Sequence, residues 1–190
     1  MSAAPQSLLD AALGYAKRGW PIFPCRWEDE SDESFQKRKA LADPNRKIKQ
    51  YTAKSPLVSG GFADASSDEA QITEWWTRWP RAMIGLPTGR ATGVWVLDVD
   101  MPTGPETLAQ IEAQHGALPA TVEQRTGGGG RQLFFTYPDQ GLEIRNTARK
   151  VGPGLDVRGE GGYVVIPPSG HPSGGSYEWV RTPKQGTPFC

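Results

Sequence analysis

The segment "VWVLDVDMP", residues 94–102, decides most of what the sequence predicts about this chain. Its branched apolar residues and Trp95 predict a buried strand, but Asp98 and Asp100 interrupt it one residue apart. Strand side chains alternate between faces, so the two carboxylates share one face about 7 Å apart. Like charges at that spacing repel each other on a half-buried face. The pair therefore predicts a divalent-cation site, unless the strand simply ends at Asp100 with both acids in solvent.

A third acid lies in a second predicted strand. In "GPGLDVRGEGG", residues 152–162, Asp156 and Arg158 share one strand face between glycine turns. Two acids from one strand and one from another form the arrangement that holds two metal ions for nucleotidyl transfer. Between these strands lies "TGGGGRQLFF", residues 126–135. Its glycines let backbone N–H groups approach a ligand, although such a run before a strand is also typical of a flexible hairpin.

The remaining periodicities predict an α+β fold, because helices dominate early and strands dominate late. We expect a long loop over residues 27–53. Helices are expected over residues 7–19, 66–80 and 104–116, and further strands over residues 21–25, 82–89, 121–126, 131–138, 161–169 and 176–180.

Two segments could serve either structure or nucleic-acid binding. In the helix over residues 66–80, which a Ser66–Glu69 capping box should start, an apolar stripe carries three tryptophans. The stripe could be a base-stacking platform, but this spacing is more often core, and we predict core. The loop over residues 27–53 runs from acidic to basic. It is either a solvated face or a nucleic-acid contact.

Bulk composition excludes several classes of protein. The formal net charge is zero, so nucleic-acid binding must come from local patches. The only cysteines, Cys25 and Cys190, are too few for a zinc site made of cysteine alone. No apolar run reaches the length of a membrane span, and no signal-peptide pattern is present. We expect a reduced, cytoplasmic protein that does not use a membrane.

Taken in order, these segments resemble a known family. From "AALGYAKRGWPIFP" through "VWVLDVD" and "TGGGGRQLFF" to "GLDVRGEGGYVVIPPSGHPSGGSYEWV", nearly the whole chain resembles the N-terminal domain of bifunctional DNA primase/polymerases (prim-pol). These proteins occur on plasmids, phages and mobile elements and belong to the archaeo-eukaryotic primase superfamily.

The resemblance implies one catalytic domain over residues 1–190, with an RRM-like catalytic sheet packed against an N-terminal α/β lobe. It implies template-directed nucleotidyl transfer with Mg²⁺ or Mn²⁺, and DNA template, primer and nucleoside triphosphates as partners. The host would be a prokaryotic cell. The chain would be the N-terminal part of a longer replication protein, in which a helical region and often a helicase follow.

The family pattern assigns roles to individual residues. Asp98, Asp100 and Asp156 match its metal-binding, catalytic acids. Gln132 stands where the family usually has a histidine that contacts the phosphates of the incoming nucleotide. An amide can still donate a hydrogen bond there, but it cannot carry charge. Arg131 faces the other way and is an imperfect substitute.

Five further residues are candidates for nucleotide binding. Arg158 could bind a triphosphate or pair with Asp156, and Lys54 could reach phosphate or template or simply be solvated. His171 is a candidate nucleotide or template contact. Thr88 and Gly89 form a turn beside the first acidic strand and could line the sugar pocket.

Three alternatives belong to other classes. The same sheet could be a catalytically weak module that binds nucleotide or single-stranded DNA, which the Gln132 departure favours. A replication-initiator nuclease would need paired metal-binding histidines, whereas His115 and His171 lie far apart in the sequence. A Rossmann enzyme is disfavoured because the glycine run leads into an apolar strand, not a helix.

Overall fold

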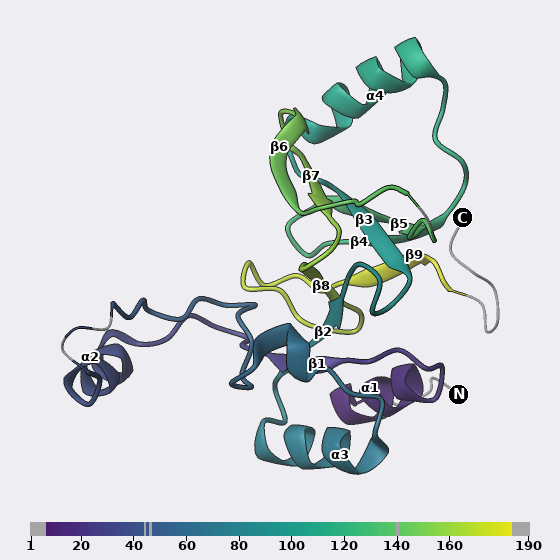
Figure 1. Ribbon diagram of the computed structural model, residues 1–190. Helices are drawn as coiled ribbons and strands as arrows, with labels where there is room; N and C mark the ends of the chain where they lie inside the picture. Colours follow the sequence, from purple (N-terminus) through teal and green to yellow (C-terminus); the bar gives the residue numbers. More distant parts are fainter. Residues whose placement is uncertain (1–6, 44, 46, 140, 184–190) are drawn as a thin grey trace.

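The computed structural model describes residues 7–43, 45, 47–139 and 141–183. These residues form two antiparallel sheets and four α-helices arranged as two lobes with an arm at one side (Figure 1). The predicted α+β class is confirmed. Cys190 lies outside the described residues, and Cys25 is buried with a free thiol. No helix in the described ranges is long and apolar enough to cross a membrane.

The N-terminal lobe contains a three-stranded sheet in the order β1-β2-β8. Helices α1 and α3 pack against each other beside it. The strands are β1 (Phe23–Cys25), β2 (Met83–Pro87) and β8 (Tyr163–Ile166); the helices are α1 (Leu8–Ala16), α3 (Glu69–Arg78) and a 3₁₀ turn, η1 (Gly61–Asp64). Because β8 comes from late in the sequence, the chain returns to this lobe after five strands of the other sheet and then leaves again to form β9 (Glu178–Arg181).

The second lobe is a six-stranded sheet in the order β6-β7-β3-β5-β4-β9. The strands are β3 (Val94–Val99), β4 (Val122–Arg125), β5 (Arg131–Thr136), β6 (Thr147–Gly152), β7 (Leu155–Arg158) and β9 (Glu178–Arg181); α4 (Gly104–His115) connects β3 to β4. The four central strands, β7-β3-β5-β4, have the order of an RRM-like β-α-β-β-α-β sheet. The RRM-like arrangement has a second helix before its last strand, whereas the described residues have β6 before β7. The sequence pattern did not predict β6.

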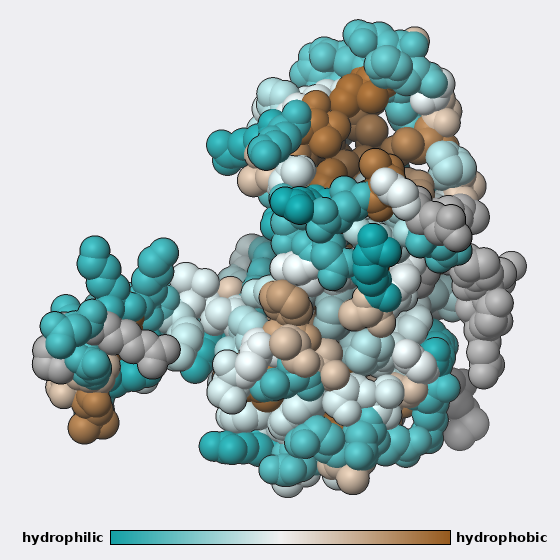
Figure 2. Space-filling model, in the orientation of Figure 1, coloured by the Kyte–Doolittle hydropathy of each residue, from teal (hydrophilic) through white to brown (hydrophobic). Residues whose placement is uncertain are grey.

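The six-stranded sheet has a different core on each face. One face contributes Val94, Val96 and Phe134 to the core that also contains α1 and α3. The opposite face contributes Leu97 and residues of β5 and β7 to a second core with α4. Apolar side chains are visible beneath α4 in Figure 2. The alternation of β3 therefore sends its even-numbered side chains, Asp98 included, towards the N-terminal lobe.

The tryptophan stripe of α3 is core, as predicted. Ile72, Trp75 and Trp76 are buried, and Trp79 is partly buried against the same cluster. The predicted Ser66–Glu69 capping box is wrong. Asp68 caps α3 instead, because its carboxylate accepts from the N–H groups of Ala70 and Gln71.

The predicted loop over residues 27–53 is also partly wrong, because it contains α2 (Asp32–Ala40). The hydroxyl of Ser31 caps this helix, acidic residues fill its first turn and basic residues its last. None of its residues is buried. Hydrophobic periodicity could not reveal it, because local capping and charge order stabilise the helix without an apolar face.

Two tryptophans of the α3 stripe, Trp76 and Trp79, should contribute differently to the free energy of unfolding. Trp76 is 2% exposed, and its indole N–H donates to the Ala82 carbonyl. We expect Trp76→Ala to lower the free energy of unfolding by about 3–5 kcal/mol in urea titrations. Trp79→Ala, the matched control, should cost clearly less and leave single-stranded DNA affinity unchanged. A large loss of DNA affinity in the Trp79 variant would show that the stripe is a stacking platform after all.

Candidate active site

A row of polar side chains crosses the six-stranded sheet on the face towards the N-terminal lobe. Asp98 of β3 lies directly opposite Asp156 of β7 on one side and Gln132 of β5 on the other. Gln132 in turn pairs with Gln124 of β4. Directly opposed residues have Cβ atoms about 5 Å apart. The register therefore places two predicted acids and the predicted phosphate contact in adjacent positions.

Asp98 is the buried centre of this row. It is 8% exposed, and its Oδ1 is buried without a hydrogen-bond partner among the described residues. Burial, followed by the charge of Asp100, raises the pKa of Asp98 to about 6; the Gln132 side chain and Arg158 oppose this shift, and Asp156 adds to it. A buried polar atom without a partner is costly. The site therefore gains from a cation at this oxygen.

The other two acids flank Asp98 in different ways. Strand β3 ends at Val99, so Asp100 is exposed just beyond it, where its N–H donates to the Gly154 carbonyl. The expectation that both acids sit within the strand is thus wrong by one residue. Asp156 is half-buried, and its Oδ2 lies 2.9 Å from Nη2 of Arg158.

Arg158 acts as an internal counter-ion between the two strands. Its Nη2 also lies 3.8 Å from Oδ2 of Asp98, and about a third of its side chain is exposed. The guanidinium therefore pairs with Asp156 and partly neutralises Asp98. Of the two alternatives open from the sequence, the structure shows the ion pair to Asp156.

The glycine run forms the turn of the β4–β5 hairpin, which passes directly over the end of β3. Thr126 and Gly130 close it by a backbone hydrogen bond, and Gly129 has a φ of 89°. A Cβ on Gly130 would lie 2.8 Å from the Val99 carbonyl oxygen. Glycine is therefore required for the hairpin to approach the backbone beside Asp100.

Gln124, which sequence reasoning missed, fixes the orientation of the Gln132 amide. Gln124 is fully buried, and its Nε2 donates both to the Val165 carbonyl, at 2.8 Å, and to Oε1 of Gln132. A backbone carbonyl only accepts, so the Gln124 atom facing it must be the nitrogen. Gln132 must then present its oxygen to Gln124, which leaves its own NH₂ group as donor for the rest of the site. A Gln three residues before the glycine run, on the Asp98 face, was the available sequence signal.

Lys54 and His171 connect the N-terminal lobe to the hairpin. Nζ of Lys54 lies 2.9 Å from Nε2 of His171, which accepts because an ammonium group only donates. Nδ1 of His171 lies 2.7 Å from the Ser173 hydroxyl, which donates to the Gly127 carbonyl. Burial lowers the pKa of Lys54, while Asp98 and Asp100 oppose that shift. The Lys54 ammonium is thus within the field of the acids.

Three predicted residues lie elsewhere. Arg131 pairs with Glu123 at 3.2 Å, and the strand alternation places it on the α4 face of the sheet, away from Asp98. Thr88 is buried and donates its hydroxyl to the Gly159 carbonyl, and Gly89 packs against Glu160. This turn pairs with Val94, at the start of β3 and about 13 Å along the strand from Asp98. The structure does not bring these three residues to the carboxylates.

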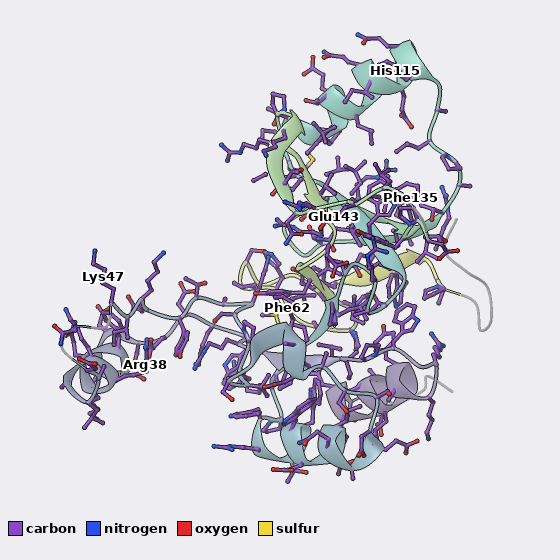
Figure 3. The ribbon with its side chains drawn as sticks, in the orientation of Figure 1. Arg38, Lys47, Phe62, His115, Phe135 and Glu143 are labelled. Carbon is purple, nitrogen blue, oxygen red and sulfur yellow. The ribbon has the colours of Figure 1, made fainter. Side chains whose placement is uncertain are left out.

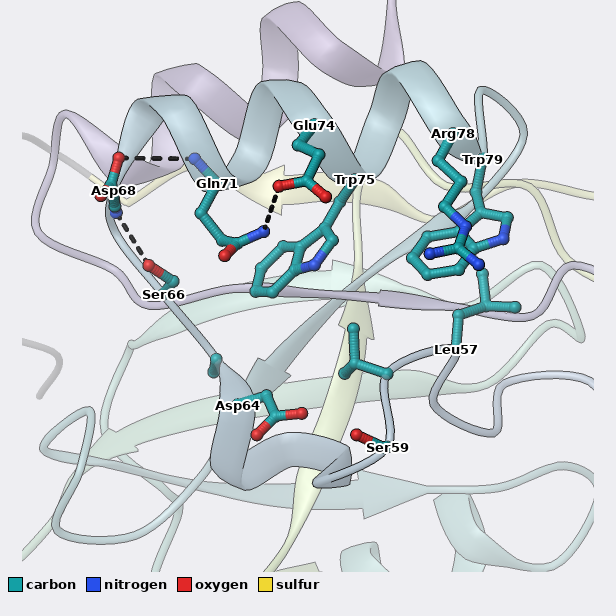
Figure 4. A pocket seen from close by; sticks show the side chains of 12 residues that line it. Leu57, Ser59, Asp64, Ser66, Asp68, Gln71, Glu74, Trp75, Arg78 and Trp79 are labelled. Carbon is teal, nitrogen blue, oxygen red and sulfur yellow. Dashed lines mark hydrogen bonds between the residues drawn. The ribbon is translucent and has the colours of Figure 1, made fainter.

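The hollow beside α3 is a poor alternative site for nucleotides. It has a volume of about 650 Å³, and Trp75 and Trp79 line it together with Asp64, Asp68 and Glu74 (Figure 4). Only one cation, Arg78, lines it, and that guanidinium lies over the Trp79 ring at 4.7 Å. An acidic lining of this kind repels phosphate.

Comparison with known proteins identifies the family. The sequence profile described as "Bifunctional DNA primase/polymerase, N-terminal" matches residues 12–189. The chain belongs to this prim-pol family. No curated protein matches it.

One solved structure similar to the prim-pol chain is the polymerase domain of ligase D from Mycobacterium tuberculosis, in complex with DNA. The sequences are 15% identical, the match covers 70% of this chain, and the TM-score is 0.29. The chain spans about half of that structure, 55% of its length.

The carboxylate oxygens of Asp98, Asp100 and Asp156 in this prim-pol domain are the kind of ligand that a hard divalent cation prefers. Asp98 and Asp156 face each other in the polar row, Asp100 lies just beyond the end of β3, and Asp98 offers a buried oxygen without a partner among the described residues. Within the described residues, however, no three His, Cys, Asp or Glu side chains are already close enough to surround an ion. Arg158 stands between two of the acids. Binding therefore requires the Arg158 side chain to give way.

The raised pKa of Asp98 predicts a pH-dependent stability without metal. The folded pKa of about 6 exceeds the ordinary value near 4, so the charged form destabilises the fold and stability falls as pH rises through 6. We expect Asp98→Asn to melt about 3 °C or more above wild type at pH 8 in EDTA, and this difference should shrink as the pH falls from about 6 to about 4. Mg²⁺ should stabilise wild type more than the variant at pH 8. Identical melting temperatures at pH 8, with and without Mg²⁺, would contradict a strained carboxylate at this position.

Proposed function

We propose that this chain is a nucleotidyltransferase that extends a primer on a DNA template, with Asp98, Asp100 and Asp156 holding Mg²⁺ or Mn²⁺. The observation that carries the proposal is the cross-strand placement of Asp98 against Asp156 and Gln132 within a prim-pol domain. Two divalent ions would activate the attacking hydroxyl and neutralise charge on the phosphates. A replicon of a plasmid, phage or other mobile element is the proposed setting, on the family resemblance alone.

The chain's own residues supply binding and orientation. The NH₂ group of Gln132, oriented by Gln124, donates to a phosphate oxygen of the incoming nucleotide. Arg158, released from Asp156, is long enough to reach the same triphosphate, and Lys54 adds a positive charge at the rim beside His171. These three side chains supply donors on the face that carries the acids. Preorganised donors of this kind stabilise developing negative charge.

A second candidate function is a nucleotide-binding or single-stranded DNA-binding module without efficient catalysis. Gln132 favours it, because an amide in the family's histidine position cannot become charged against a triphosphate. The Arg158 ion pairs with Asp156 and Asp98 point the same way, since they compete with metal for these acids. Both candidates predict nucleotide binding, and only the first predicts extension.

Primer extension with Mg²⁺ and with Mn²⁺ tests the proposal. We expect wild type to extend a primed template, and Asp98→Asn, Asp100→Asn and Asp156→Asn each to lose at least about a thousandfold in rate. Glu106→Gln on the exposed face of α4 is the matched control and should extend normally. Nucleotide binding without extension by wild type, in either metal, would support the binding module instead.

The oriented amide predicts coupled effects of Gln124 and Gln132. Gln132→Ala removes a hydrogen bond to an anion, and we expect nucleotide affinity to fall about tenfold or more. Gln124→Met should weaken nucleotide binding through Gln132, so the double variant should bind no more weakly than Gln132→Ala alone. Additive losses in the double-mutant cycle would show that Gln124 does not act through Gln132.

The Gln132→His variant tests whether residue 132 contacts phosphate, because a charge gained at that position should strengthen nucleotide binding. Gln132→His should bind nucleotide more tightly at pH 6 than at pH 8, because the imidazole gains a proton at the lower pH. Wild type should lack this added pH dependence. Equal pH profiles would mean that residue 132 does not contact phosphate.

A further inference from the structure

The segment between Arg26 and Ser55 forms an arm that projects from the body (Figure 1). Its two legs are joined by hydrogen bonds. Arg26 exchanges backbone bonds with Lys54 and Ser55, and Glu30 donates its N–H to the Tyr51 carbonyl. Further out, the guanidinium of Arg38 donates to the Lys49 carbonyl. The arm is therefore an ordered two-legged structure with α2 at its tip.

The arm is stabilised by its own polar contacts and not by the core. Arg38 binds Glu30 with two hydrogen bonds, and its guanidinium lies 4.1 Å from the centre of the Tyr51 ring. Arg26 lies 4.4 Å from the same ring. The Arg38 pair lowers the pKa of Glu30 to about 2. These contacts stabilise the legs, yet the body gains no packing from α2, which has no buried residue.

Charge is strongly segregated onto the tip of the arm. Residues 35–50 hold six of the chain's 21 basic residues and one acid, although the whole chain has a formal net charge of zero. Glu33 and Glu30 pair with Lys37 and Arg38. Three lysines on the arm are exposed and have no ion pair with a described residue: Lys39, Lys47 and Lys49. Arg46 lies outside the described residues. Figure 3 shows Lys47 directed away from the arm.

A groove lies between α2 and the returning leg. It has a volume of about 730 Å³, and its lining combines lysines and Arg38 with Leu41, Ile48 and Tyr51. Leu41, the C-cap residue of α2, is 90% exposed at this groove. Cations that follow a backbone, next to apolar groups that bases can contact, are the combination found in grooves for single-stranded nucleic acid.

The returning leg of the arm ends at the candidate active site. It ends at Lys54, the residue that contacts His171 and lies in the field of Asp98 and Asp100. The returning leg therefore connects the edge of the site to the basic tip of the arm. The arm offers the positive charge that the protein as a whole lacks.

We propose that the arm binds the single-stranded part of the DNA template beside the active site, with Lys39, Lys47 and Lys49 on its phosphates. This proposal rests on the proposed function, since it assigns a place to that reaction's template. The proposal gives a role to both the acidic and the basic part of the arm. The hydrogen bonds between Glu30 and Arg38 hold the two legs together, and the lysines at the tip contact the DNA.

The salt dependence of DNA binding tests the arm. The probe is a fluorescent oligothymidylate, titrated with the full chain between 50 and 300 mM NaCl. Each phosphate contact contributes about 0.7 to the slope of log K against log salt for single strands, so Lys39→Ala/Lys47→Ala/Lys49→Ala should lower that slope by about 2. Affinity at the lowest salt should fall about tenfold or more, and excess primed template should recover the extension rate.

The matched control removes three exposed cations, two just beyond the end of α1 and one in the last turn of α3, in Lys17→Ala/Arg18→Ala/Arg78→Ala. It should retain the wild-type slope. An unchanged slope in the arm variant, or an equal loss in the control, overturns the assignment of the arm while leaving extension by wild type as support for the proposed function. Wild type that extends no primer and binds no oligothymidylate overturns both.

Discussion

The site is organised around one unfavourable feature, the buried carboxylate of Asp98, which faces Asp156 across β3 and β7. The rise in the pKa of Asp98 from 3.8 to about 6 corresponds to about 3 kcal/mol against the charged form. A purely structural sheet would have an apolar pair at this position. The Gln132 side chain and Arg158 reduce the cost but do not remove it, since Oδ1 of Asp98 still lacks a partner in the described chain. A divalent cation is the simplest species that would satisfy the two carboxylates in place of Arg158.

Both lobes are needed to assemble the site. The carboxylates come from the six-stranded sheet, but Gln132 is oriented by Gln124 and the Val165 carbonyl of the other sheet. Lys54 contacts His171, and Ser173, which contacts the same imidazole, donates to Gly127 in the glycine hairpin. The Gln132 amide is thus fixed by a specific partner. A donor fixed in this way works without a proton equilibrium, whereas a histidine would respond to pH.

Residues with strong local patterns were predictable, and residues placed by long-range pairing were not. The alternation of Val94–Val99 gave the strand, its faces and the position of Asp98, and the α3 stripe gave the core. Gln124 was missed because its role depends on register across three strands and on a carbonyl from β8. Helix α2 was missed because capping and ion pairs, not apolar periodicity, define it. Arg131 is the sequence neighbour of Gln132, but strand alternation places it on the other face, and Thr88 lies in a turn that pairs with the start of β3, away from the acids.

Direct measurement of Mn²⁺ binding tests the central claim, that the strained carboxylates form a cation site. The signal of free Mn²⁺ in electron paramagnetic resonance, recorded with the full chain and without nucleotide, reports the bound fraction. The account predicts saturable binding by wild type that is tighter at pH 7.5 than at pH 5.5, because Asp98 must lose its proton, and much weaker binding by Asp98→Asn. Equal binding by wild type and Asp98→Asn, or none by either at millimolar Mn²⁺, would contradict it.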